Sequence, residues 1–243
     1  MPTLTTNSDA IRPRPYLSND AMALSRLEER LPLLLSVIAG MVDLSGFFML
    51  GNVFTAHITG NLVVVAAAAV RGDPLSLAQA LSIPVFILAL AAVWLLARAS
   101  GRRGAGLARL LLLIQFLLLA GLLIFSVITK PSASPHGLMA EIAVTIAVSA
   151  IACQYALFRL AIPGAISTAV MTGNLTNTVL SLMDVLSPSR PLMPVDAGRL
   201  KKSLRLLVGF LVGCVVAAGA ISLLGDWAWS IPAALAAVAL ALR

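Results

Sequence analysis

The chain has 243 residues, of which 60% are hydrophobic and 11% are charged, and its mean hydropathy is +0.99. Soluble domains carry about 25% charged residues, so this composition excludes an ordinary water-soluble protein and predicts an all-α polytopic membrane protein. The formal net charge is +7, but the basic residues lie between and beside the apolar windows. They are typical of topology signals that face anionic lipid, so we expect the lipid bilayer and no nucleic acid as a partner.

Residues 1–30 are polar and predict a flexible cytoplasmic tail with a short helix over 21–30. The first apolar window, 31–50, contains Asp43 near its middle. An isolated charge there costs roughly 2.5 to 3.5 kcal/mol on insertion scales, so Asp43 should face the bundle interior and have a partner. Two roles are open: a functional carboxylate, or a protonated side chain satisfied by Ser45 or a backbone carbonyl.

An octapeptide that follows the first window occurs twice, 113 residues apart, with six of eight positions identical. The copies read Thr55-Ala56-His57-Ile58-Thr59-Gly60-Asn61-Leu62 and Thr168-Ala169-Val170-Met171-Thr172-Gly173-Asn174-Leu175. One copy in each half predicts an internally duplicated helical bundle. We place the first transmembrane repeat at 31–129, a linker at 130–137 and the second repeat at 138–243.

The number of crossings follows from where the basic residues lie. Apolar windows span 31–50, 55–70, 81–97, 110–128, 138–160, 167–182, 206–224 and 227–242. If all eight cross, twelve of the seventeen Lys and Arg are cytoplasmic; if the two short windows with the repeated motif do not cross, fifteen are. The positive-inside rule therefore favours six crossings, with both termini cytoplasmic. Eight crossings, which would make the repeats parallel, are the alternative.

Six crossings place three in each half, so the repeats are inverted and each adds one short broken or re-entrant helix. Transporters use this topology to build a site near the membrane midplane. Within each motif, glycine allows close approach, the threonine hydroxyl can bond a freed carbonyl, and the asparagine amide both donates and accepts. The two motifs either coordinate a polar solute or pack helices through hydrogen bonds, and the sequence favours neither.

Asp43 and His57 would form a proton-relay pair if the chain folds back around Gly51 and Asn52. Alternatively, His57 only packs or lies at an interface, because its counterpart Val170 is apolar. Gln154 and Tyr155 occupy the equivalent zone of the second half, with Tyr155 opposite Asp43 when one gap is allowed. Any site is therefore expected to be chemically asymmetric.

Signatures of enzymes are missing from the sequence. There is no HExxH, GxSxG or Walker-type glycine loop, and the two histidines do not form a metal-binding spacing. Cys153 and Cys214 lie inside apolar windows, where a free thiol behaves as a small hydrophobe. We therefore expect no enzymatic activity, no cofactor and no metal site.

The stretch Ala39-Gly40-Met41-Val42-Asp43, followed by Phe54-Thr55-Ala56-His57-Ile58-Thr59-Gly60-Asn61, resembles the hallmark of the YoaK family of bacterial membrane proteins, also called DUF1275 or UPF0700. In the second half, Gln154-Tyr155-Ala156 and Thr172-Gly173-Asn174 are similar to that family's Gln-Asn-Ala and second Thr-Gly-Asn. The departure is Tyr155, where asparagine is common. The resemblance covers 31–242 and implies a location in the bacterial inner membrane, without implying a substrate.

Two hypotheses of function follow. In the first, the chain is a transporter or channel-like permease for a small solute or ion, and Asp43 carries the coupling proton. The pathway would be lined by polar and glycine residues of both halves: Asp43, His57, Thr59, Gly60, Asn61, Gln154, Tyr155, Thr172, Gly173 and Asn174. In the second, the chain is a non-transporting membrane scaffold or assembly protein, and its motifs serve helix packing. The sequence indicates no oligomeric state.

Overall fold

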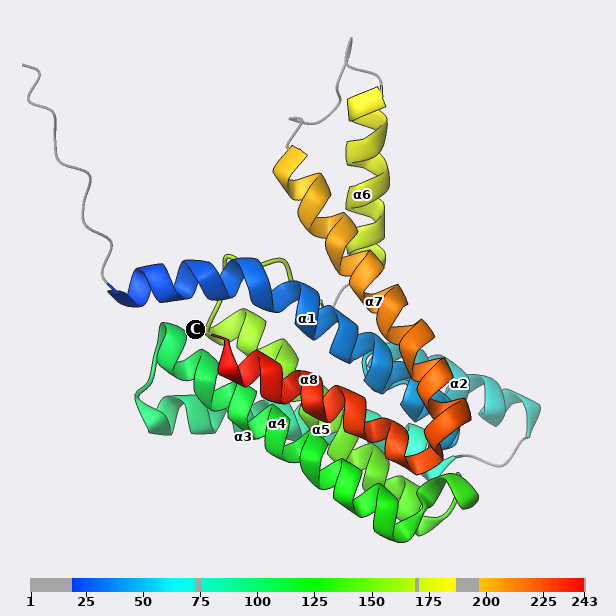
Figure 1. The fold of residues 1–243 in the computed structure, drawn as a ribbon. Coiled ribbons are helices and arrows are strands. Elements are labelled where there is room, and N and C mark those ends of the chain that lie inside the picture. Colours follow the sequence, from blue (N-terminus) through cyan, green and yellow to red (C-terminus); the bar gives the residue numbers. More distant parts are fainter. Residues whose placement is uncertain (1–18, 73–75, 169–170, 187–196, 243) are drawn as a thin grey trace, which may run out of the picture.

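The computed structural model describes residues 19–72, 76–168, 171–186 and 197–242. This part of the chain is helical and contains no strand, which confirms the predicted all-α class. Its elements are α1 (Asn19–Met49), α2 (Ile58–Arg71), α3 (Leu77–Ser100), α4 (Gly104–Thr129), η1 (Pro131–Ala133), α5 (Leu138–Leu160), α6 (Met171–Leu186), α7 (Ala197–Leu224), η2 (Gly225–Trp229) and α8 (Ser230–Ala241). Their arrangement is shown in Figure 1.

Five segments of the described chain are long and apolar enough to cross a membrane. They are Leu27–Met49, Leu77–Ser100, Gly104–Thr129, Leu138–Leu160 and Leu200–Ala241. The last one contains α7, η2 and α8, and the chain turns back at η2, so the two windows predicted there are separate helices (Figure 1). The protein is thus a multi-pass, membrane-type helical protein.

The two helices that begin within the repeated motif are short. α2 has 14 residues and α6 has 16, whereas a helix needs about 20 to cross the hydrocarbon. α2 ends at Gly72 in a left-handed conformation. This is the usual way for a helix to stop, because glycine has no Cβ to clash there.

The helix predicted for 21–30 forms, but it is continuous with the first span. α1 runs without interruption from Asn19 to Met49, so the predicted boundary at residue 31 falls inside a helix. Residues 1–18 of the predicted tail lie outside the described residues. Of the long loop predicted after α6, residues 187–196 also lie outside them.

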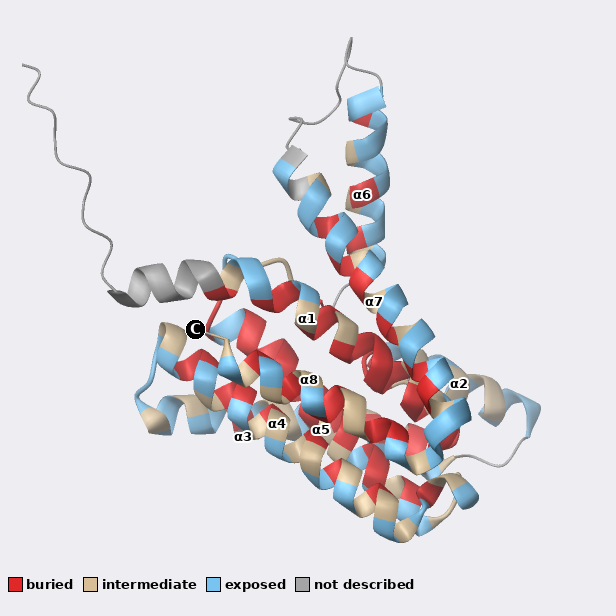
Figure 2. Cartoon of the chain, in the orientation of Figure 1, coloured by how far each residue is buried: buried red, intermediate tan, exposed pale blue. Residues whose placement is uncertain are grey.

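The core of the bundle surrounds α5, whose described residues from Ala147 to Phe158 are nearly all buried (Figure 2). α5 packs against α3 and α4, and α1 packs against α7 and α8. Of the two short helices, α2 packs on α3 and α6 packs on α7. α4 also packs on α8. The two predicted repeats are therefore interleaved and do not form separate domains.

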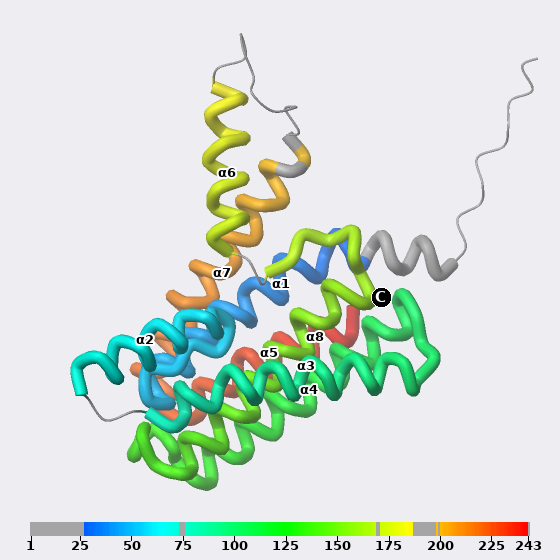
Figure 3. Tube along the Cα trace, turned by 180° about the vertical axis from the view of Figure 1, so that it is seen from behind, coloured from blue at the N-terminus to red at the C-terminus, as the bar shows by residue number. Residues whose placement is uncertain are grey.

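α6 and the first part of α7 stand away from the rest of the bundle, as both ribbon views show (Figures 1 and 3). Large apolar side chains of α6 are exposed there, among them Leu175, Val179 and Leu186. In a membrane protein such side chains face lipid, so their exposure needs no further explanation.

Glycines allow α1 and α7 to cross in close contact. A Cβ built on Gly213 would collide with the carbonyl oxygen of Val37, and one built on Gly40 would collide with that of Phe210. Gly209 and Gly213 form the GxxxG spacing that brings membrane helices together. The crossing is reinforced by the Ser36 hydroxyl, which donates a hydrogen bond to the carbonyl oxygen of Leu206 at 2.5 Å.

The substitution Gly213→Ala should destabilise the protein because the added methyl group forces the two backbones apart. Overpacking of this kind costs about 1 to 3 kcal/mol, and we expect a lower melting temperature in detergent. The control is Gly219→Ala, on the same helix, where an added Cβ meets nothing within 4 Å. Because alanine favours helix over glycine, this control should melt at the wild-type temperature or higher. Equal melting of the two variants would contradict a glycine-dependent crossing.

Candidate functional site

The chain reverses direction directly after α1. Gly51 and Asn52 have positive φ angles of 77° and 59°, a conformation that glycine and asparagine tolerate best. The N–H groups of Leu50 and Asn52 donate to the carbonyl oxygens of Gly46 (3.0 Å) and Phe47 (3.1 Å), so the end of α1 stays hydrogen-bonded. Residues 50–57, which we call the return segment, then run back along α1.

Gly46 makes this close approach to α1 possible. A Cβ at position 46 would lie 2.7 Å from Cγ2 of Thr55 and 2.9 Å from the carbonyl oxygen of Val53. Any other residue would push the return segment away. Val53, Thr55 and Ala56 are consequently buried against the bundle.

Asp43 holds the end of the return segment. Its Oδ1 accepts hydrogen bonds from the N–H groups of Ala56 at 2.7 Å and His57 at 3.4 Å. Its Oδ2 lies 2.6 Å from Nδ1 of the His57 ring. The chain thus folds back around Gly51 and Asn52, which was the condition for an Asp43–His57 pair, and Asp43 has a partner as its place in an apolar window predicts. The Asp43 side chain is 7% exposed and that of His57 is 41% exposed, so the pair connects the interior with the surface.

Two neighbouring residues of α5 contact the segments that precede the two short helices. The Tyr155 hydroxyl donates to the carbonyl oxygen of Ala56 at 2.9 Å. Nε2 of Gln154 donates to the carbonyl oxygen of Leu35 at 2.9 Å and to the Thr168 hydroxyl at 3.1 Å. Both segments thus meet at one position of α5.

The alignment of the two half-sequences makes Tyr155 the counterpart of Asp43, but the hydrogen bonds in the structure make Gln154 that counterpart. Gln154 binds the segment before its own short helix, as Asp43 does in the first half, whereas Tyr155 reaches across to the first half. Successive helical residues point about 100° apart, so a shift of one position changes which segment a side chain meets. The segment before α2 is thus bonded by a carboxylate, that of Asp43, and the segment before α6 by an amide, that of Gln154.

Asn61 connects the return segment to α2 and α3. Its Oδ1 accepts from the N–H of Phe54 at 2.8 Å, and its Nδ2 donates to the carbonyl oxygen of Phe54 at 2.7 Å and to the Ser82 hydroxyl at 2.8 Å. Asn174 repeats one of these contacts 113 residues later, because its Nδ2 donates to the carbonyl oxygen of Ser167 at 3.1 Å. Both asparagine side chains are buried and hold the backbone that precedes their helices.

The other residues of the two motifs have matching environments. Thr59 and Thr172 are exposed, and Gly60 and Gly173 are half-buried. A Cβ at Gly60 would lie 3.2 Å from the Phe54 ring, so this glycine makes room for the aromatic side chain. The structure therefore gathers Asp43, His57 and Tyr155 at the return segment, and Gln154 lies beside Tyr155 on α5 but bonds α1, α4 and Thr168. The threonines lie exposed on α2 and α6.

Sequence reasoning missed several polar residues that support the site. Nε2 of Gln115 on α4 donates to Oε1 of Gln154 at 2.8 Å, and both side chains are buried. Gln79 donates to the carbonyl oxygen of Asn52 at 3.1 Å and so fixes the turn. A signal existed for Gln115, because an amide within an apolar span must find a hydrogen-bond partner in the protein. Gln79 and Ser82, near the start of a span, carried no such signal.

Among the described residues, no group of three or more His, Cys, Asp or Glu side chains gathers that could hold a metal ion. At the site described above, Asp43 and His57 supply only two potential metal ligands. Protein zinc sites use three or four.

Comparison with known proteins agrees with the sequence motifs. A family model described as "Protein of unknown function (DUF1275)" matches residues 31–242. The chain belongs to the DUF1275 family. The match extends from the apolar part of α1 to the end of α8, so the whole site of this DUF1275 protein lies within it. No curated protein and no solved structure matches the chain.

The substitution Asn61→Ala should destabilise the DUF1275 protein, because it removes the buried amide that bonds both the N–H and the carbonyl of the half-buried Phe54. Each unsatisfied buried group costs about 1 to 3 kcal/mol, so we expect a clearly lower melting temperature in detergent. Asn177→Ala, at a half-buried position of α6, is the control and should change the melting temperature little. An Asn61→Ala protein that melts like the wild type would contradict the holding role of Asn61.

Proposed function

We propose that this DUF1275 protein is a transporter or channel-like permease for a small solute or ion in the bacterial inner membrane, and that the Asp43–His57 pair carries its coupling proton. The observation that supports this most is the 2.6 Å contact between a buried carboxylate in an apolar helix and an imidazole in a non-helical segment. Ionisable residues inside membrane spans are rare because they are costly, and they commonly mark proton relays and ion pathways.

The geometry of the pair suits a relay. Asp43 lies six residues before the end of α1, which is about 9 Å of helix, so its carboxylate is within the span. The return segment brings the half-exposed ring of His57 to it. Imidazole can accept a proton on one nitrogen and release one from the other. A proton can therefore pass between the protein surface and Asp43 without a charge being left unpaired.

Helix contacts support the inverted repeat that forms part of the proposal. α2 packs on α3 as α6 packs on α7, α3 packs on α5 as α7 packs on α1, and α4 packs on α5 as α8 packs on α1. These three contacts of the first half each have a counterpart in the second half, whereas the contact of α1 with α4 has no comparable one between α5 and α8. The matching contacts of Asn61 and Asn174 with the seventh residue before each of them support the same relation.

Charge supports an orientation with both termini in the cytoplasm. The start of α1, the turn between α3 and α4 and the C-terminal end lie at one end of the bundle (Figure 1). Four arginines gather at that turn or next to it: Arg98, Arg102, Arg103 and Arg109. Under the positive-inside rule, this end faces the cytoplasm.

Within the proposed pathway, the motif residues take different roles. Asn61 and Asn174 hold the segments that frame the site, because their amides bond backbone groups. Thr59 and Thr172 are exposed on the first turns of α2 and α6, so the interior of the proposed pathway does not depend on their hydroxyls. Gln154, bonded to Thr168, contributes the polar group of the second half.

A second candidate function is a membrane scaffold or assembly protein whose motifs only pack the chain. The observation that favours it is the Asn61 side chain, which makes three hydrogen bonds inside the protein. An amide engaged in this way is not available to coordinate a solute. The two candidates differ in whether the protein moves protons.

The proposal is tested by proton movement in proteoliposomes that contain a pH-sensitive dye. The wild-type protein is challenged with a panel of small polar solutes and monovalent ions under an imposed pH gradient. We expect at least one of them to elicit proton flux, and we expect Asp43→Asn to abolish that flux. Asparagine keeps the Oδ1 acceptor for the Ala56 N–H but cannot carry the proton, so the variant should remain folded.

The control is Glu141→Gln, which removes another carboxylate at the start of α5 and should leave the flux unchanged. Wild-type flux in Asp43→Asn would refute the coupling role. A folded wild-type protein that moves no protons with any member of the panel would favour the scaffold.

A further inference from the structure

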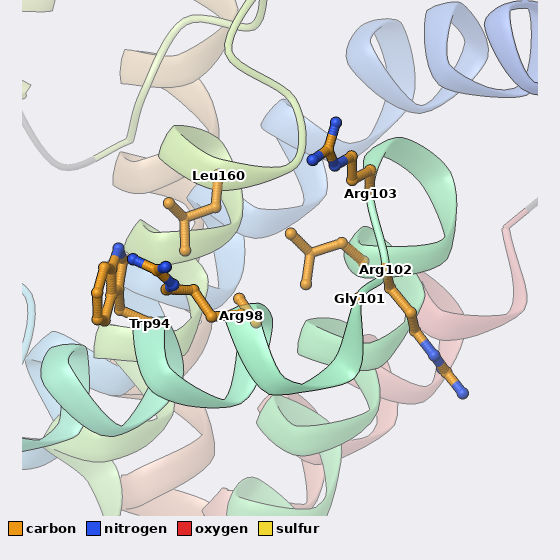
Figure 4. A pocket seen from close by; sticks show the side chains of 8 residues that line it. Trp94, Arg98, Gly101, Arg102, Arg103 and Leu160 are labelled. Carbon is orange, nitrogen blue, oxygen red and sulfur yellow. The ribbon is translucent and has the colours of Figure 1, made fainter.

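A hollow of about 560 Å³ lies at the turn between α3 and α4, where the apolar spans end (Figure 4). Its lining includes three arginines, a tryptophan and two leucines: Arg98, Arg102, Arg103, Trp94, Leu107 and Leu160. None of these residues takes part in the hydrogen bonds of the Asp43–His57 site. A ligand in the hollow would therefore be bound by different side chains from those of the proposed transport.

The turn keeps its cationic side chains outside the bundle. α3 ends at Ser100, with Gly101 as its C-cap, and α4 begins at Gly104; both glycines have positive φ angles, of 62° and 51°. The Ser100 hydroxyl donates to the carbonyl oxygen of Ala97 at 2.9 Å and accepts from the N–H of Arg102 at 3.3 Å. This bonding fixes the backbone from which Arg102 and Arg103 project.

Within the described part of the chain, none of the three arginines of the hollow forms an ion pair with a carboxylate. The Arg98 guanidinium stacks on the Trp94 ring, 4.8 Å from its centroid. Such stacking orients a guanidinium while its N–H groups stay available. α4 also starts without a side-chain cap, so the partial positive charge of its N-terminus adds to the same field.

The surroundings of the hollow are apolar on the side of the membrane. Leu95, Leu96 and Trp94 on α3 are 60%, 41% and 46% exposed, and Leu160 on α5 is 37% exposed. A tryptophan between an apolar surface and a row of cations is typical of the membrane interface. A ligand that fits both sides has an anionic head and a hydrocarbon tail.

We propose that this hollow binds the headgroup phosphate of an anionic phospholipid. Arg98 and Arg103 bind the phosphate oxygens, for which the planar guanidinium has matching geometry. Arg102, whose side chain points away from Trp94 and Leu160 in Figure 4, adds to the positive field. The acyl chains lie along the exposed leucines of α3. Basic pockets between membrane helices at the cytoplasmic side are a common form of lipid site. Free phosphate would meet the same guanidinium groups but would gain nothing from the apolar wall.

The test is native mass spectrometry of the purified full-length protein in detergent, titrated with phosphatidylglycerol or phosphatidylcholine. We expect the wild type to retain one phosphatidylglycerol and to bind phosphatidylcholine at least about tenfold more weakly. The triple variant Arg98→Gln, Arg102→Gln, Arg103→Gln should lose this preference. The matched control removes three cations at the exposed start of α7, through Lys201→Gln, Lys202→Gln and Arg205→Gln, and should retain it.

Two further arms complete the test. The single variant Arg98→Gln, which keeps the turn intact if the triple variant does not fold, should weaken phosphatidylglycerol binding by about fivefold. Inorganic phosphate in excess should displace little of the lipid. Equal losses in the triple variant and its control would overturn the proposal, because general charge would then explain the binding. Full displacement by inorganic phosphate would also overturn it in favour of a soluble anion.

Discussion

The structure depends on one constraint, which is that a carboxylate in an apolar helix must receive hydrogen bonds from the protein. Asp43 receives them from Ala56 and His57, residues that follow the end of its own helix. The chain can supply these donors only if it stops being helical and turns back. Gly46 provides the room for the returning backbone, and Gly51 provides the left-handed turn. The buried charge and the break in helical structure are therefore two aspects of one arrangement.

The same arrangement joins the two halves of the chain. Tyr155 of α5 bonds the carbonyl of Ala56, and its neighbour Gln154 bonds both α1 and the segment before α6. A change in the geometry of the Asp43–His57 pair would therefore affect the contacts of helices in both halves. Outside the site, Gly40 and Gly213 bring α1 and α7 into direct backbone contact.

Sequence patterns predicted the parts of the structure that composition and local chemistry control. Apolar windows located the helices, and the charge of Asp43 required a partner, which His57 provides once the chain folds back. Sequence patterns could not predict the partners of Asn61, because an amide can bind either a solute or backbone groups. Only the folded chain shows that Asn61 bonds the backbone of Phe54. The helix over 21–30 was predicted, but its continuity with the first span was not, because polarity before residue 31 indicates exposure to water and does not show where one helix ends. The role of Gly213 depended on which helix lies opposite, and helix pairing cannot be read from a single sequence.

The central claim is that Asp43 takes up and releases a proton inside the membrane while His57 stays bonded to it. Infrared difference spectroscopy of the protein in lipid, recorded between alkaline and acidic buffer, measures this directly through the carbonyl stretch of a protonated carboxyl group. The account predicts a band that appears on acidification, is missing in Asp43→Asn and shifts in His57→Gln, while Glu141→Gln retains it. A spectrum in which Asp43→Asn and the wild type show the same carboxyl bands at every pH would contradict it.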